Sequence, residues 1–415
     1  MIAARFARVE SRRLVGDAVL GLMSDLPVKN CWTLAEHAGH ESPDRLQHLL
    51  RKAKWDDDGV REDLRGYVVE RLGSDDAVLV VDETGDLKKG ACTVGVQRQY
   101  TGTAGRIENA QVAVYLTYAT AAGHALIDRE LYLPQVWAGD PDRREQAVVP
   151  AEVEFATKPA LATEMITRAL GAGVTADWAA GDEAYGGDPK LRKTLEDRGV
   201  GYVLAVACSH PVRTRVGKIR ADELAAWLPR KAWQRLSAGE GSKGPRFYDW
   251  AWIGIEPDRD GIDSHYWLLI RRSNTTGELA YYRCWAPPAV PLRELVRVAG
   301  RRWTIEESFQ ASKTLTGLDQ HQVRRWTSWR RWTILTMLAY AFLAVVTATE
   351  RIENPAPQTS SLIALSCNEI KHLFNTLAAD PIHSLQHRLR WSIWRRRHQH
   401  RARASHYHRR QALTA

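Results

Sequence analysis

The segment DDAVLVVDETG, residues 75–85, decides the expected fold because it is an uninterrupted apolar run that ends in acidic residues and a turn. An apolar run of this length without alternation is typical of a strand that is buried on both faces of a sheet. Asp82 is expected to stand where this strand ends, and a lone carboxylate is costly to desolvate there. A second acid, Asp182, follows another short apolar strand in DWAAGDEAYGG, residues 177–187.

The two aspartates together predict a cation site. If both strands belong to one sheet, Asp82 and Asp182 come close together, and the repulsion between their charges requires a cation. Hard oxygen ligands of this kind suit Mg²⁺, and two such ions can activate water and stabilise the leaving oxygen in phosphodiester cleavage. The alternative is that each carboxylate only caps the turn or helix that follows it.

A third group of charged residues lies in RRWTIEESFQASK, residues 301–313, which is expected to be one helix. At about 100° per residue, Glu306 lies about 40° and Lys313 about 20° from Arg302, so the three share one stripe. This stripe offers a carboxylate to a metal ion and cations to phosphate oxygens. Glu307 is rotated by about 100° from Glu306 and is expected to pair with a neighbouring base or water. The alternative is a solvated helix face with ion pairs at four-residue spacing.

The remaining sequence divides by composition into five ranges. Within the first, CWTLAEHAGHESPDRLQHLLRKAKW (residues 31–55) predicts either a helix-turn-helix that contacts DNA or a plain helical hairpin. The ranges are 1–70, helical; 71–207, alternating strands and helices; 208–285, rich in strands; 286–346, helical and carrying the third acid; and 347–415, helical and basic.

Positive charge is concentrated near the C-terminus. The net charge is +9 for the whole chain, but residues 321–415 hold fifteen Lys and Arg against four Asp and Glu, a net charge of +11. This asymmetry predicts a polyanionic partner. The segment RLRWSIWRRRHQHRARASHYHRR, residues 388–410, has nine arginines and no acid, and Arg395, Arg396 and Arg397 are expected to contact DNA phosphates. A disordered basic end is the alternative.

Several other classes of protein are not indicated. The five cysteines form no C-x-x-C pair, so neither a zinc site nor a disulfide framework is expected. The first residues, MIAARFARVESRRL, lack the apolar region of a signal peptide. The longest apolar run, ILTMLAYAFLAVV (residues 334–346), is short for a bilayer span and predicts a buried core helix, so no membrane partner is expected.

From about residue 76 to 345 the sequence resembles the DDE transposases of bacterial insertion sequences, in the cut-and-paste branch. Their third acid lies in the signature Y-x2-R-x3-E-x6-K, which Arg302, Glu306 and Lys313 match at the required spacing. Ala299 takes the tyrosine position, a departure from the signature. Asp82 and Asp182 are similar in context to the first and second acids.

The resemblance implies an α/β protein with a ribonuclease-H-like catalytic core, formed by residues 71–207 and 286–346, and a β-rich insertion at 208–285. It implies that Asp82, Asp182 and Glu306 are catalytic and hold two Mg²⁺ ions, with Mn²⁺ as a substitute, while Arg302 and Lys313 bind phosphate. It also implies a homodimer on double-stranded DNA, in the bacterial cytoplasm at the nucleoid. Strands would be cut by water, and the freed 3′-OH would attack target DNA. A nuclease of the same fold and a non-enzymatic DNA-binding regulator are the alternatives.

Overall fold

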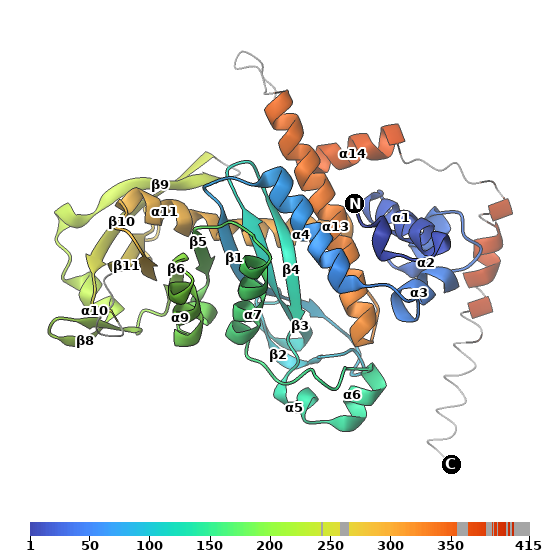
Figure 1. Cartoon of the computed structure of the whole chain (residues 1–415), viewed down its shortest axis with the longest axis horizontal. Coiled ribbons are helices and arrows are strands. Elements are labelled where there is room, and N and C mark those ends of the chain that lie inside the picture. Colours follow the sequence, from blue (N-terminus) through green and yellow to red (C-terminus); the bar gives the residue numbers. More distant parts are fainter. Residues whose placement is uncertain are drawn as a thin grey trace. The chain divides into compact units, whose positions relative to one another are not determined.

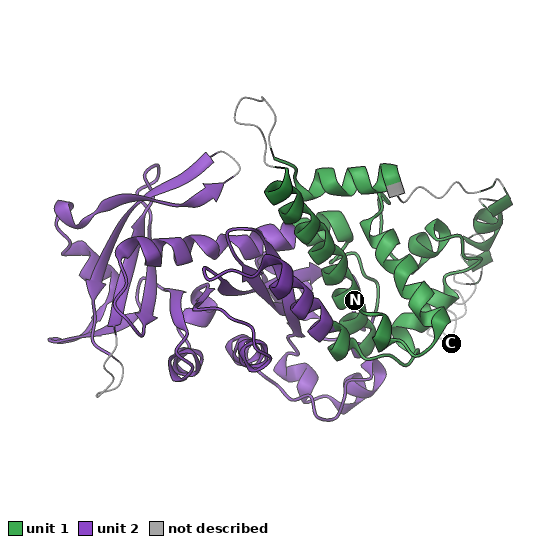
Figure 2. Cartoon of the chain, turned by 45° about the horizontal axis from the view of Figure 1, so that its top comes forward, with its two compact units in different colours: residues 1–60, 311–323, 327–415 green, residues 61–310, 324–326 purple. Residues whose placement is uncertain are grey.

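The computed structural model describes residues 1–241, 244–257, 265–354 and 364–378, and further along the chain residues 384, 386, 387, 389–395, 397, 398 and 401. The chain divides into two compact units, which Figure 2 colours separately. The first, here called the helical unit, comprises residues 1–60, 311–323 and 327–415. The second, here called the sheet unit, comprises residues 61–310 and 324–326.

A ten-stranded mixed sheet forms the centre of the sheet unit (Figure 1). Strands β1, β5 and β6 are parallel to one another, and the other neighbouring pairs are antiparallel. Across the sheet the order is β2 (Gln97–Thr101), β3 (Arg106–Ala119), β1 (Val78–Leu87), β5 (Trp178–Gly181), β6 (Gly201–Val206), β12 (Leu279–Ala286), β11 (His265–Arg272), β10 (Gly244–Gly254) and β9 (Gln234–Gly241), with β4 (His124–Leu131) paired to β3. A separate hairpin consists of β7 (Pro211–Thr214) and β8 (Gly217–Arg220).

Helices accompany both units. The sheet unit contains most of α4 (Asp57–Leu72), then α5 (Gln135–Ala138), α6 (Pro141–Ala147), α7 (Lys158–Gly171), α8 (Glu183–Gly186), α9 (Pro189–Asp197), α10 (Ala221–Ala226), η2 (Arg230–Ala232), α11 (Leu292–Arg301) and nearly all of α12 (Trp303–Ala311). The helical unit contains η1 (Ala3–Arg5), α1 (Val9–Met23), α2 (Cys31–His37), α3 (Asp44–Arg51), η3 (Ser312–Thr316), nearly all of α13 (Trp326–Glu353), and α14 (Cys367–Ala378).

The strand predicted in residues 75–85 is present, but it is longer than expected. β1 continues to Leu87, so Asp82 lies inside the strand, and the expectation that it stands at the strand's end was wrong. What ends before Asp82 is the parallel pairing with β5, whose last pair is Val81 with Gly181. The fully buried part of β1 also ends close to this point, because its first four residues are buried and Asp82 is partly exposed.

Helices cover both faces of this sheet. Asp82 on β1 lies 3.7 Å from Arg302, between α11 and α12, whereas its neighbour Glu83 lies 2.5 Å from Lys158, the first residue of α7. Successive side chains of a strand point to opposite faces of its sheet. Helices α7 and α12 therefore lie on opposite faces of β1.

The strand-rich range 208–285 contains β7 to β11 and nearly all of β12. Four of these strands, β9 to β12, extend the central sheet, because β12 pairs with β6 along Tyr281–Trp285. Helix α11 packs against β9, and the packing is close at Gly300, where a Cβ atom would lie 1.9 Å from the carbonyl oxygen of Ala238.

The single helix expected over residues 301–313 is interrupted. Helix α11 ends at Arg301, Arg302 follows as its C-cap, and α12 occupies Trp303–Ala311. A π-helical turn, η3, then covers Ser312–Thr316 and ends at Gly317, which has φ = 72°. The uniform 100° geometry assumed for Lys313 is therefore not found there.

The apolar run 334–346 lies in α13, a helix of 28 residues. The helix is long and apolar enough to cross a membrane, but 83% of its apolar window is buried inside the structure. Such burial is typical of the core helix of a globular protein, as the sequence predicted.

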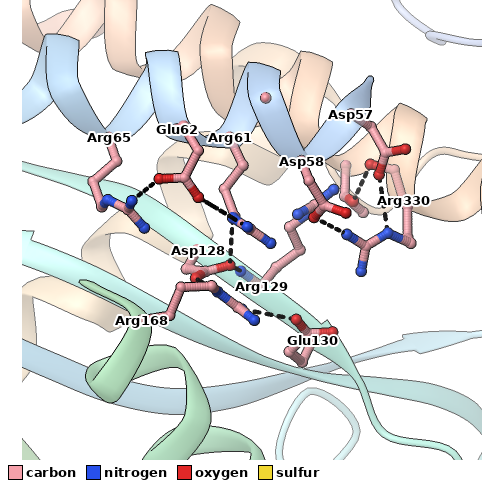
Figure 3. A network of polar contacts seen from close by, with 12 residues as sticks. Asp57, Asp58, Arg61, Glu62, Arg65, Asp128, Arg129, Glu130, Arg168 and Arg330 are labelled. Atoms are coloured by element: carbon pink, nitrogen blue, oxygen red, sulfur yellow. Dashed lines mark hydrogen bonds and ion pairs between the residues drawn. The ribbon is translucent and has the colours of Figure 1, made fainter. Parts of the chain in front are cut away.

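A buried cluster of charges joins α4, β4 and α7 in the sheet unit (Figure 3). Asp128 on β4 is fully buried. It forms an ion pair with Arg168 on α7 at 2.9 Å and a longer one with Arg61 on α4 at 3.8 Å. Arg168 also pairs with Glu130 at 2.8 Å. A buried carboxylate is tolerated only when it is paired in this way, so the cluster fixes how these three elements pack.

Candidate active site

The two aspartates predicted to act together do occupy equivalent positions on neighbouring strands. Asp82 follows Val81 and Asp182 follows Gly181, the last residue pair between the parallel strands β1 and β5. Neighbouring strands lie about 4.8 Å apart, so the two carboxylates start from adjacent backbone positions. Asp182 is also the N-cap of α8, as the capping alternative predicted.

One oxygen of each aspartate is fixed by a backbone N–H group. The N–H of Glu83 donates to Oδ1 of Asp82 at 2.7 Å, and the N–H of Ala184 donates to Oδ1 of Asp182 at 2.9 Å. These bonds orient both carboxylates. Asp82 directs its Oδ2 toward Arg302, whose Nη1 lies 3.7 Å away.

Burial and neighbouring acids disfavour the ionisation of both carboxylates. Burial, followed by the charges of Asp182 and Glu83, raises the pKa of Asp82 to about 8. Burial and the charge of Glu83 likewise raise the pKa of Asp182 above its ordinary value. Both pKa values are shifted in the direction expected when acidic groups lie close together in a partly desolvated site. A cation bound between the two carboxylates would instead lower their pKa values.

Arg302 connects the first acid to the third. Its Nη2 donates to Oε1 of Glu306 at 3.0 Å, while its Nη1 faces Asp82. The pairing of Arg302 with Glu306 is the four-residue ion pair that the sequence offered as the alternative to a metal-binding stripe. In this arrangement the guanidinium lies between Asp82 and Glu306, so it neutralises both acids.

Glu307 is directed to a different partner. Its Oε2 lies 3.3 Å from Nε2 of His124, at the start of β4, and His124 Nδ1 lies 2.8 Å from Oγ of the buried Ser308. The expectation that Glu307 pairs with a neighbouring base is confirmed. The bond to His124 lowers the pKa of Glu307. Lys313 is not in this unit, since it lies half-buried in η3 of the helical unit.

Three residues beside the aspartates were not identified from the sequence. Glu83 accepts hydrogen bonds from Lys158 and from the hydroxyl of Tyr185, both at 2.5 Å. The segments DETG and GDEAYG contain Glu83 and Tyr185, so proximity to the acids was the available signal. Lys158 is 75 residues from Glu83, and no local pattern links the two.

The acidic side chains suit a divalent cation in their chemistry. Carboxylate oxygens are the ligands that Mg²⁺ prefers, and burial together with neighbouring acidic charge raises the pKa values of both Asp82 and Asp182. Among the residues that the structure describes, no three His, Cys, Asp or Glu side chains form a ready-made metal cluster. The carboxylate of Glu306 is instead ion-paired with Arg302.

The basic segment near the C-terminus is only partly a free surface. Arg395 pairs with Glu36 on α2 at 2.5 Å, and Arg397 is exposed; Arg396 lies outside the described residues. Trp391 is fully buried and donates its Nε1 hydrogen to the carbonyl of His40 at 2.8 Å. Trp394 also packs against Trp391 and against Trp32 of α2, so both tryptophans of this segment pack within the helical unit.

Two family models match the sequence of this chain. A family model described as DDE superfamily endonuclease matches residues 2–244, and a model described as transposase DDE domain matches residues 157–342. The probable transposase for insertion sequence element IS701 from Microchaete diplosiphon is 26% identical over 302 residues, which are 72% of this chain and 73% of that protein. A solved piggyBac transposase synaptic complex with hairpin DNA covers 93% of this chain and 76% of its own, at 10% identity and a TM-score of 0.49.

Proposed function

Since the chain belongs to the DDE superfamily endonucleases, as a transposase of an insertion sequence, we propose that it cuts DNA at the element's ends and joins them to a new site by two-metal chemistry. Its catalytic core would be the ribonuclease-H-like one implied by the family resemblance. It would act as a homodimer on double-stranded DNA, in the bacterial cytoplasm at the nucleoid.

The observation that carries the proposal is the placement of Asp82 and Asp182 directly after the last β1–β5 residue pair. Two Mg²⁺ ions, with Mn²⁺ as a substitute, would activate the attacking water and stabilise the leaving oxygen when bound. Asp82 and Asp182 would hold these ions, with Glu306 as the third ligand. The backbone N–H groups on each Oδ1 keep both aspartates oriented for this task.

Arg302 would exchange partners during the reaction. Without bound cations, its guanidinium neutralises Asp82 and Glu306. Cations bound at the acids would take over that role, and Arg302 would then be available to a DNA phosphate, for which the guanidinium fork is well suited. Lys313 would contribute a second phosphate contact.

The experiment compares two aspartates that both cap helices. Asp182 caps α8 and Asp188 caps α9, so Asp→Asn at either position keeps a good capping residue. The substrate is a labelled duplex made from the inverted repeats in the DNA that flanks the reading frame, incubated with Mg²⁺. Asp182→Asn should abolish cleavage, whereas Asp188→Asn should cleave as the unmodified protein does.

Two results would count against the proposal. Normal cleavage by folded Asp182→Asn protein would remove this aspartate from the catalytic site. Cleavage without any joined product would favour a nuclease of the same fold. Size-exclusion chromatography with light scattering on the same duplex tests the homodimer, which a single protein copy per DNA end-pair would contradict.

A further inference from the structure

Glu83 is held from both sides by residues outside the acid triad. Its Oε1 accepts from the ammonium group of Lys158, and its Oε2 accepts from the hydroxyl of Tyr185. Both oxygens are therefore already in use, at 2.5 Å each. A carboxylate bound in this way is an anchor, and it points away from the face on which Asp82 meets Arg302.

The anchor links the two segments of the chain that carry the aspartates. Glu83 follows Asp82, and its own N–H group donates to Asp82. Tyr185 follows Asp182 by three residues, in the short helix α8 that Asp182 caps. The hydrogen bond from Tyr185 to Glu83 therefore joins the segment after the first acid to the segment after the second.

Burial keeps this link intact. Tyr185 is fully buried, and burial together with the charge of Glu83 raises the pKa of its phenol well above the ordinary value, so the hydroxyl remains a donor. The following residue, Gly186, lies so close to β6 that a Cβ atom would be 1.9 Å from the carbonyl oxygen of Ala205. Helix α8 is thus pressed against the sheet, and Tyr185 has little freedom to move away from Glu83.

We propose that Glu83, Tyr185 and Lys158 form a brace that sets the separation of Asp82 and Asp182 and thereby the affinity of the site for divalent cations. The three are positioning residues, because they act through the aspartates. This inference rests on the proposed function, since it assumes that the two aspartates hold cations. Groups that orient metal ligands in this manner typically change metal affinity 10- to 100-fold when they are removed.

The test measures Mn²⁺ binding to the full chain without DNA, by electron paramagnetic resonance of the unbound ion. Tyr185→Phe removes only the hydroxyl and should weaken Mn²⁺ binding at least about tenfold. Its matched control is Tyr202→Phe on β6, since Tyr202 is also fully buried and donates to a glutamate, Glu196, at 2.8 Å. Both variants lack one buried tyrosine–glutamate bond, but only the first should bind Mn²⁺ more weakly.

Lys158 provides a second pair of variants at a partly exposed position, where folding is less at risk. Lys158→Met should weaken Mn²⁺ binding, and Lys158→Arg, which keeps the charge, should restore it toward the unmodified value. If Tyr185→Phe, Tyr202→Phe and Lys158→Met all bind Mn²⁺ with the affinity of the unmodified protein, the brace is overturned.

Results that would contradict the proposed function can be distinguished from results that would contradict only the brace. If Asp182→Asn binds Mn²⁺ normally and still cleaves, the aspartates are not the metal site and both proposals fall. If Asp182→Asn abolishes Mn²⁺ binding and cleavage while Tyr185→Phe and Lys158→Met bind Mn²⁺ normally, only the brace is overturned.

Discussion

Two adjacent glutamates on α12 show how strongly a one-residue shift changes a side chain's role. Glu306 pairs with Arg302, which also faces Asp82, whereas Glu307 pairs with His124 on β4. Glu306 is therefore connected to the acid site through Arg302. Glu307 attaches α12 to the sheet.

A pair of substitutions separates these roles. Glu306→Gln keeps the side chain's shape but removes the charge that a metal ligand needs, so DNA cleavage in Mg²⁺ should fall by about 100-fold or more. Glu307→Gln should lower the cleavage rate by less than about tenfold, because a partly exposed ion pair typically contributes under ~1 kcal/mol. Initial cleavage rates measure both, with circular dichroism as the check on folding. Normal cleavage by Glu306→Gln and an inactive Glu307→Gln would reverse the assignment.

The site residues that lie on local sequence patterns could be predicted from the sequence, whereas those that depend on contacts between distant segments could not. Arg302 and Glu306 are four residues apart on a helical stretch, so their contact follows from helical geometry. Asp82 and Asp182 each follow an apolar run. By contrast, the bond between Tyr185 and Glu83 joins residues 102 apart, and the pairing of His124 with Glu307 depends on which helix covers β4.

At the scale of elements, the strands were predictable and their pairing was not. Apolar runs identify β1, β5 and β6 because strands buried on both faces lack alternation. The attachment of β12 to β6 is set by contacts between distant segments, so the sequence suggested an insertion without showing that its strands extend the same sheet. The interruption at Arg302 was also missed, although Gly300 lies two residues before it and accepts the hydrogen bond of the Arg302 N–H group.

The buried charge cluster predicts a large effect on stability. Asp128→Asn leaves Arg61 and Arg168 without the carboxylate that both face, so the free energy of unfolding should fall by about 3–5 kcal/mol. Glu108→Gln is the control, because Glu108 pairs with Arg106 on the exposed part of β3 and should cost under ~1 kcal/mol. Urea denaturation measures both. Equal decreases would mean that Asp128 contributes no more than a surface pair.

At the scale of the whole molecule, the described arginines of the basic C-terminal segment include two that pair with glutamates and two that are exposed. Arg390 and Arg395 pair with Glu41 and Glu36, whereas Arg397 and Arg401 are exposed. The sequence could show the charge of this segment. It could not show that acids near α2 would neutralise part of that charge.

Two double variants with the same change in charge test this division. Arg397→Gln with Arg401→Gln should weaken binding to duplex DNA and make its salt dependence shallower, by about 0.9 log units of slope for each DNA phosphate that is no longer neutralised. Arg390→Gln with Arg395→Gln should change the slope less, because those arginines are held by glutamates. Salt titrations by fluorescence anisotropy distinguish the two. Identical curves for the first variant and the unmodified protein would exclude the exposed arginines as DNA-binding residues.

The distribution of the acids along the chain also has a consequence for timing. Asp82 lies on β1 and Asp182 directly follows β5 of the same sheet, but Glu306 comes 224 residues after Asp82. At a synthesis rate of roughly 5–20 residues per second, the ribosome needs on the order of 10–45 s to cover that interval. A nascent chain on the ribosome therefore carries the first two acids well before the third. A polypeptide released before α12 is made would lack Glu306, and it should be unable to cut the DNA from which its own message is being transcribed.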